Sequence, residues 1–124
     1  MSTAQATNKI ADLRYRRREL RREIARVRWW RRLVKARREL TVAQLAAATA
    51  GDADLDTTWE ALAADAPTSN EIATVIWTEE PPPTAHRLEA LDAIDHRLDS
   101  YERRLSANLE SVMAQMVDAM GAAH

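Results

Sequence analysis

Three arginines, Arg17, Arg31 and Arg38, lie in a helical register that is otherwise apolar. The other members of this register, at multiples of seven residues, are Ile10, Ile24 and Leu45. An arginine on the seam of a coiled coil weakens the packing unless an anionic group is placed against it. Arg17 can extend its charged end to solvent. Arg31 is followed on its face by Lys35 and Glu39, so this part of the seam predicts a site for an anion.

Enzyme chemistry has little support in the sequence. The histidines are not spaced as a metal-binding pair on a helix: they are His86, His96 and His124. The serines of the second half have no histidine partner visible in the sequence, and the carboxylates follow a helix face without a defined cleft. Cysteine is absent and there are two glycines, which excludes thiolate metal sites and a Gly-rich phosphate loop. We predict no catalytic residue, no metal and no enzyme activity.

The charge of the chain is divided between its two parts. Residues 1–48 carry fourteen Lys/Arg and four Asp/Glu, and residues 49–124 carry four and fifteen, so net charges of +10 and −11 make up the total of −1. Such a chain folds its basic part against its acidic part or offers the basic part to an anionic partner. A length of 124 residues suits one domain. Because no stretch is apolar enough for a signal peptide or a membrane span, we predict a cytoplasmic protein.

Two long amphipathic helices are predicted. Residues 8–48 lack Gly and Pro and carry apolar residues at steps of seven: Leu13, Leu20, Val27 and Val34. Residues 84–120, between a Thr84 N-cap and a stop at Gly121, carry apolar residues at steps of three and four: Leu88, Leu91, Ile94, Leu98, Tyr101, Leu105, Leu109, Val112, Met116 and Met120. A helix of about 40 residues, roughly 60 Å long, is too long for a compact bundle. We therefore predict an all-α, antiparallel two-helix coiled-coil hairpin.

The connector, residues 49–83, is predicted to contain one or two short helices. Leu55, Trp59 and Leu62 have the spacing of an amphipathic helix, and residues 70–77, which include Ile72 and Trp77, form a second helix or an extended segment. Both segments are acidic. They either cap the hairpin or bind a partner, since short amphipathic segments commonly dock in grooves. On the second reading these five apolar residues are the partner-binding candidates.

The basic helix has alternative interpretations. Residues 14–38 could bind nucleic acid by counterion release, with Trp29 or Trp30 as a stacking platform. Against this, the arginines surround the helix, and the acidic half of the chain competes for them. A homodimer or larger coiled-coil assembly is a further possibility.

Several segments resemble the RsiG family of anti-sigma factors, also described as aerial mycelium formation proteins. Residues 20–40, LRREIARVRWWRRLVKARREL, resemble the first helix of that family. Residues 54–67 resemble its acidic Leu-rich connector, and residues 97–110, RLDSYERRLSANLE, the start of its second helix. The resemblance implies a helical hairpin from actinobacteria that holds a WhiG-like sporulation or flagellar-type sigma factor. It also implies cyclic di-GMP as the ligand that activates the inhibitor.

The nucleotide motif of the family, E-x3-S-x2-R-x3-Q-x3-D, is incomplete on both helices. On the first helix its positions are Ile24, Arg28, Arg31, Lys35 and Glu39. On the second helix they are Glu102, Ser106, Leu109, Met113 and Val117. By this resemblance, Arg31 is kept in the first copy, and Glu102 and Ser106 are kept in the second. The remaining candidate patch for cyclic di-GMP is Arg28, Arg31, Lys35, Glu39, Glu102 and Ser106, with Lys35 and Glu39 expected to approach the last two in an antiparallel hairpin.

These losses suggest a hypothesis about regulation. A carboxylate can accept hydrogen bonds from guanine, and an arginine can bind its O6 and N7 atoms or a phosphate. The apolar replacements Met113 and Val117 remove such groups and are expected to extend the packing stripe, closing the hairpin without a ligand. We therefore predict an anti-sigma-type regulator whose dependence on cyclic di-GMP is weakened or lost. The alternatives are a regulator that still requires the nucleotide and a nucleic-acid-binding basic helix.

Overall fold

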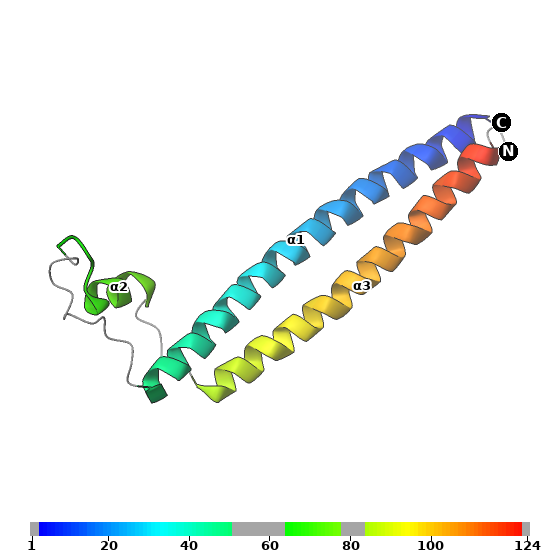
Figure 1. Ribbon diagram of the computed structural model, residues 1–124. Coiled ribbons are helices and arrows are strands. Elements are labelled where there is room, and N and C mark those ends of the chain that lie inside the picture. The colour runs from blue at the N-terminus through cyan, green and yellow to red at the C-terminus, as the bar shows by residue number, and fades with distance from the viewer. Residues whose placement is uncertain (1–2, 51–63, 78–83, 123–124) are drawn as a thin grey trace.

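The protein is an α-helical hairpin. The computed structural model describes residues 3–50, 64–77 and 84–122, and the elements in these ranges are the helices α1 (Thr3–Ala50), α2 (Ser69–Ile76) and α3 (Ala85–Ala122). The long helices α1 and α3 pack along one another in antiparallel directions, with both chain termini at the same end (Figure 1). The predicted all-α hairpin is confirmed.

α1 extends beyond the predicted range 8–48 at both ends, and α3, predicted over 84–120, begins at Ala85 and extends beyond that range at its C-terminal end. The N-cap at Thr84 is confirmed, because its Oγ1 atom accepts a hydrogen bond of 3.1 Å from the backbone N–H of Arg87. Gly121 does not stop α3, which ends at Ala122. Glycine makes the left-handed C-terminal turn easy without requiring it, so its presence near a helix end does not set the last residue.

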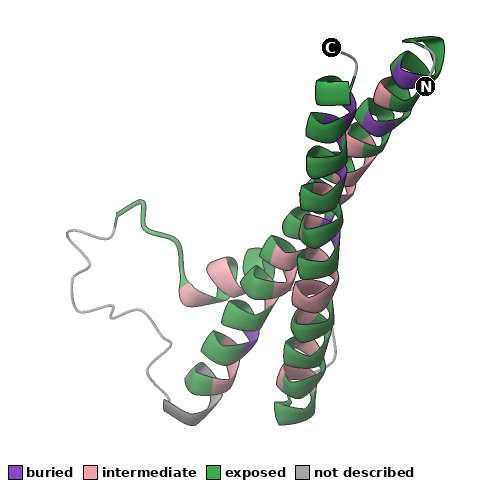
Figure 2. Ribbon diagram, turned by 90° about the vertical axis from the view of Figure 1, so that its right-hand side faces the viewer, coloured by how far each residue is buried: buried purple, intermediate pink, exposed green. Residues whose placement is uncertain are grey.

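The buried apolar residues lie in the half of the hairpin near the termini. We call residues 3–27 of α1 with residues 105–122 of α3 the terminal half, and residues 28–46 with 85–104 the connector half. Within the described residues, every buried apolar side chain belongs to the terminal half: Ala6, Leu13, Ile24, Val27, Leu105, Val112, Met116 and Ala119. Figure 2 shows them as purple segments where the helices face each other. The one buried residue described in the connector half is polar, Thr41.

Part of the predicted stripe of α3 does not reach this core. Met113 and Val117, which were expected to extend the packing, are 42% and 68% exposed. Ile94 and Met120 are exposed as well, and Ala119 is buried instead. The apolar stripe predicted for α3 is wider than the buried seam, because steps of three and four also include residues on both flanks of that seam. The buried positions follow a heptad, Leu105, Val112 and Ala119, which is the narrower seam of two paired helices.

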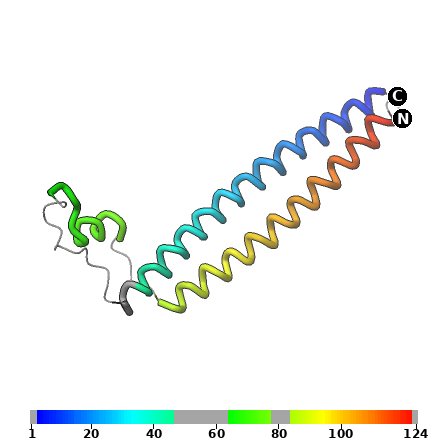
Figure 3. Tube along the Cα trace, viewed as in Figure 1, coloured from blue at the N-terminus to red at the C-terminus, as the bar shows by residue number. Residues whose placement is uncertain are grey.

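The short helix α2 resolves the choice left open for residues 70–77. Thr68 caps it, with its side chain accepting a hydrogen bond of 3.1 Å from the backbone N–H of Glu71. Ile72 and Trp77 are partly buried, and the predicted partner-binding residues Leu55, Trp59 and Leu62 lie outside the described residues. Among the described helices, α1 packs against α3, and α2 lies beyond the connector end of the hairpin (Figures 1 and 3). None of these helices combines the length and apolar character needed to cross a membrane.

Candidate functional site

Arg31 is at the centre of an ionic cluster between the two long helices. Its Nε atom donates to Asp95 at 3.1 Å, and its Nη1 atom donates to Asp99 at 3.2 Å and to Glu102 at 3.3 Å. The guanidinium of one seam residue thus contacts three carboxylates on successive turns of α3. The anion that the sequence predicts at Arg31 is supplied by the protein itself.

Two further arginines of α1 continue the cluster toward either end. Arg28 donates to the other carboxylate oxygen of Glu102 at 3.3 Å, and Arg38 donates to Asp92 at 2.6 Å. On α3, Arg103 pairs with Asp99 at 3.1 Å. Each acidic residue of the cluster therefore has at least one cationic partner. The site is close to neutral although α1 as a whole is strongly basic.

The spacing of these residues explains why they meet. On the face of α1 that carries the cluster, the basic residues are spaced by three, four and three positions: Arg28, Arg31, Lys35 and Arg38. The acidic residues of α3, namely Asp92, Asp95, Asp99 and Glu102, repeat the same steps. Steps of three and four keep side chains on one face of a helix. An antiparallel arrangement lays the two faces together, so matching step patterns of opposite charge are the signal that could have identified the cluster.

Arg31 is a permanent cation at the centre of the cluster. The pKa of Arg31 is raised above its usual value, chiefly by the hydrogen bond to Asp95, and partial burial opposes this effect. Arginine is already protonated throughout the range in which proteins are folded. The cluster is therefore held by a cation that does not titrate in that range.

The predicted cyclic di-GMP patch is only partly assembled. Arg28, Arg31 and Glu102 come together, as the resemblance implied. Lys35 instead lines a hollow with Asp92 and Asp95, which lie about two and three turns before Glu102 on α3. The register explains this difference. Arg31 meets Asp99, so the antiparallel helices carry each later residue of α1, including Glu39, away from Glu102 and Ser106.

The hollow beside Arg31 is small. It has a volume of about 230 Å³ and is lined by the following residues: Arg31, Arg32, Val34, Lys35, Arg38, Asp92 and Asp95. Pockets for drug-sized ligands are usually about 300–1,000 Å³. A cyclic dinucleotide is larger than most such ligands, and its phosphates would meet two carboxylates here. The hollow suits a small group or ordered water better than a dinucleotide.

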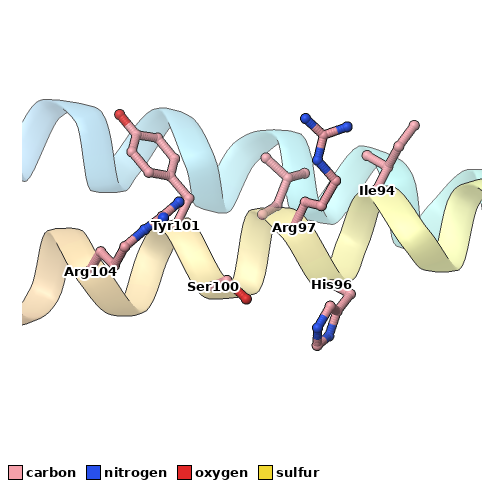
Figure 4. Close-up of a pocket in the computed structure, with 7 residues that line it drawn as sticks. Ile94, His96, Arg97, Ser100, Tyr101 and Arg104 are labelled. Atoms are coloured by element: carbon pink, nitrogen blue, oxygen red, sulfur yellow. The ribbon is translucent and has the colours of Figure 1, made fainter.

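A second hollow, of about 490 Å³, is lined by residues of α3 alone. Figure 4 shows Ile94 and Arg97 pointing to one side of the helix, and His96 and Ser100 to the other. The hydroxyl of Tyr101, which also lines it, donates a hydrogen bond of 3.2 Å to Glu23 of α1. Partial burial and this hydrogen bond raise the pKa of Tyr101 above its usual value. This hollow is a surface depression on one helix, not a cleft that encloses a substrate.

Among the described residues, no acidic side chain pairs with Arg17, unlike with the seam arginines Arg31 and Arg38. Arg17 lies two heptads before Arg31 on α1, and Met113 lies two heptads after Asp99 on α3. Because Arg31 pairs with Asp99 in an antiparallel arrangement, continuing this register along both helices brings Arg17 opposite the thioether of Met113. Its Nε atom is buried and makes no hydrogen bond to any described residue. Arg17 as a whole is half-buried, so the extension of its charged end to solvent stays a prediction.

The described residues contain no group of three or more His, Asp or Glu side chains arranged to hold a metal ion. In comparisons with protein-family models, curated proteins and solved structures, nothing matches this chain. Its function is therefore argued from the geometry of the hairpin.

Proposed function

We propose that this protein is an anti-sigma-type regulator that sequesters a WhiG-like or flagellar-type sigma factor without requiring cyclic di-GMP. The proposal combines the resemblance of its helices to the RsiG family with one observation. Arg31, at a nucleotide-motif position that this chain keeps, already contacts Asp95, Asp99 and Glu102 of the opposite helix. The carboxylates of the chain therefore occupy the place where an anionic ligand would join the two arms.

Charge supports the loss of nucleotide dependence. A ligand that bridges two arms contributes most when those arms repel or lack contacts. Here Arg28, Arg31 and Arg38 are each paired with a carboxylate of α3. A dinucleotide with two phosphates would have to displace these carboxylates and then sit beside them, which costs Coulomb energy at short distance. The hairpin is closed by its own side chains.

The proposed partner is tested with purified components. The full chain is mixed with a WhiG-type sigma factor, and the complex is measured by size-exclusion chromatography and by calorimetry, with and without cyclic di-GMP. We expect a complex in the absence of nucleotide and the same dissociation constant in its presence. A sigma factor that elutes separately under both conditions would contradict the partner. A complex that forms only with nucleotide would contradict ligand independence.

The nucleotide is also tested on the chain alone. Isothermal titration of the full chain with cyclic di-GMP is expected to give no heat of binding. Binding at micromolar or lower concentration that is abolished in Arg31→Ala but kept in Arg21→Ala, an exposed arginine outside the cluster, would show that the site is retained. The matched control separates loss of one specific contact from loss of one positive charge.

A further inference from the structure

α1 carries a second apolar stripe that does not face α3. Trp29, Leu33 and Leu40 are 48%, 43% and 40% exposed. Ala36, between the last two, is exposed as well. Trp30 flanks the stripe and packs edge-on against Trp29, with ring centroids 4.8 Å apart. Single exposed apolar residues are ordinary, but a continuous group that includes two tryptophans indicates an interaction site.

The stripe has the spacing of a coiled-coil seam. Trp29, Leu33, Ala36 and Leu40 follow steps of four, three and four, which repeat the a and d positions of a heptad. The first seam of α1 includes the buried residues Val27 and Thr41, so the second seam lies on a different face of the same turns. Ala36 between two leucines leaves space that the side chain of another helix can enter. A helix with two seams is suited to pack between two other helices.

The residues that continue the stripe toward the N-terminus of α1 indicate which charge a helix docked on this face would carry. One heptad before Trp29 is Arg22, and one heptad before Leu33 is Arg26. Both side chains are exposed, by 67% and 63%, and their ion pairs with Glu19 and Glu23 lie within α1. Arg32 flanks the apolar part and is exposed too. A helix that matched this face would bring apolar residues against the tryptophan and leucines, and carboxylates against the arginines.

We propose that this outer face of α1, from Arg22 to Leu40, docks an acidic amphipathic helix of a partner protein. The observations behind this inference do not involve the proposed sigma factor: they concern a face that neither closes the hairpin nor belongs to the Arg31 cluster, and the expected binding holds whichever protein carries the helix. A second copy of α1 fits this face poorly, since each copy brings the same excess of arginine. Nucleic acid would match the arginines but leave Leu33 and Leu40 without an apolar partner.

The test uses the fluorescence of the stripe. In the full chain with Trp59→Phe and Trp77→Phe, emission reports on Trp29 and Trp30. The probe is a synthetic helical peptide with leucine at every a and d position and glutamate at the flanking positions. A second peptide with lysine in place of glutamate is the charge control. We expect saturable binding of the glutamate peptide with a blue shift of the emission, and no blue shift with the lysine peptide.

Variants of the chain locate the binding face by calorimetry, which does not depend on tryptophan emission. The Trp29→Ser/Leu33→Ser chain and the Val117→Ser chain are each titrated with the glutamate peptide, and circular dichroism checks that both stay helical. Val117 is an exposed apolar residue on α3 and serves as the matched control. We expect the double variant to bind about tenfold more weakly or worse, a loss of about 1.4 kcal/mol or more, and the control to bind as before.

Several outcomes would overturn the proposal. They are an unchanged emission with the glutamate peptide, equal binding of the lysine peptide, and equal loss in the Val117→Ser control. Duplex DNA or anionic vesicles that bind this face more tightly than the peptide would assign it to a different class of partner. Sedimentation that shows a dimer dependent on Trp29 and Leu33 would assign it to a second copy of the chain.

Discussion

The two halves of the hairpin are held together by different forces. In the terminal half, Leu13 packs with Val112, Met116 and Ala119 in a buried cluster. In the connector half, the long helices face each other across ion pairs centred on Arg31. The first half buries apolar surface, which stabilises without a preferred direction and is not subject to the screening that weakens interactions between charges. The second half depends on charges that are partly exposed to solvent, so its contribution is smaller and falls as salt rises.

This difference assigns separate roles to the two halves. The terminal half supplies most of the free energy that keeps the arms paired, because burial of one apolar side chain contributes roughly 1.5–3 kcal/mol. The connector half sets the register of the two helices, because each α1 arginine of the cluster pairs with particular carboxylates of α3. The connector half is also the end of the hairpin beyond which α2 lies.

The largest effect is expected from Leu13→Ala. This substitution removes a side chain from the buried cluster of the terminal half and should lower the free energy of unfolding by about 2–4 kcal/mol. Urea denaturation measures the change. Val117→Ala is the control, since Val117 is exposed, and a change within about 0.5 kcal/mol is expected there. Equal losses in the two variants would show that the stability of the terminal half does not come from burial.

A smaller effect is expected from Arg31→Met in the connector half. The substitution leaves Asp95, Asp99 and Glu102 without their shared cation. A loss of about 1–2 kcal/mol at low salt is expected from the missing charged hydrogen bonds and the repulsion among the carboxylates. Urea denaturation is repeated at about 1 M salt, where the Debye length is about 3 Å.

The salt dependence of these losses then distinguishes the two halves of the hairpin. The Arg31→Met loss should shrink to less than half at high salt, whereas the Leu13→Ala loss should stay the same. Arg21→Met, at an exposed arginine outside the cluster, should change little under either condition. A salt-independent Arg31→Met loss would mean that the connector half is not held by Coulomb attraction that salt can screen.

The smallest effect is expected from Met113→Glu, which tests whether a cross-helix ion pair can be added in the terminal half. Met113→Glu places a carboxylate opposite Arg17, whose Nε atom is buried without a hydrogen-bond partner among the described residues. A gain of about 0.5 kcal/mol is expected, typical of a single pair near the surface, and thermal unfolding measures it. Ala114→Glu, one residue further along on an exposed position, should give no gain. A gain in both variants would reflect general attraction to the basic helix.

Much of the hairpin is readable in the sequence because the relevant signals are local. The N-cap at Thr84 and the absence of Gly and Pro from residues 8–48 act within one helix. Once the helices are antiparallel, the acidic start of α3 must face the basic later part of α1. Thr41 also continues the heptad of Val27 and Val34, so its burial could have been predicted, although a threonine carries no apolar signal.

The candidate site was harder to predict because it depends on two helices at once. The sequence identified Arg31 as a seam cation in need of an anion. It did not say whether that anion would be a nucleotide or a carboxylate of the chain. Likewise, Met113 and Val117 look like seam residues from their spacing, yet both are exposed. Each error concerns the position of one helix relative to the other.

The sequence by itself determined two helices of opposite charge and the seam on which Arg17, Arg31 and Arg38 lie. The tertiary structure alone decided the register, in which Arg31 meets Asp95, Asp99 and Glu102 while the Nε atom of Arg17 is buried without a hydrogen-bond partner among the described residues. The physical reason is that helix formation and amphipathicity depend on neighbours within a few residues. Register depends on the summed packing and charge along the whole contact between α1 and α3, so the partner of a seam charge is a property of the pair.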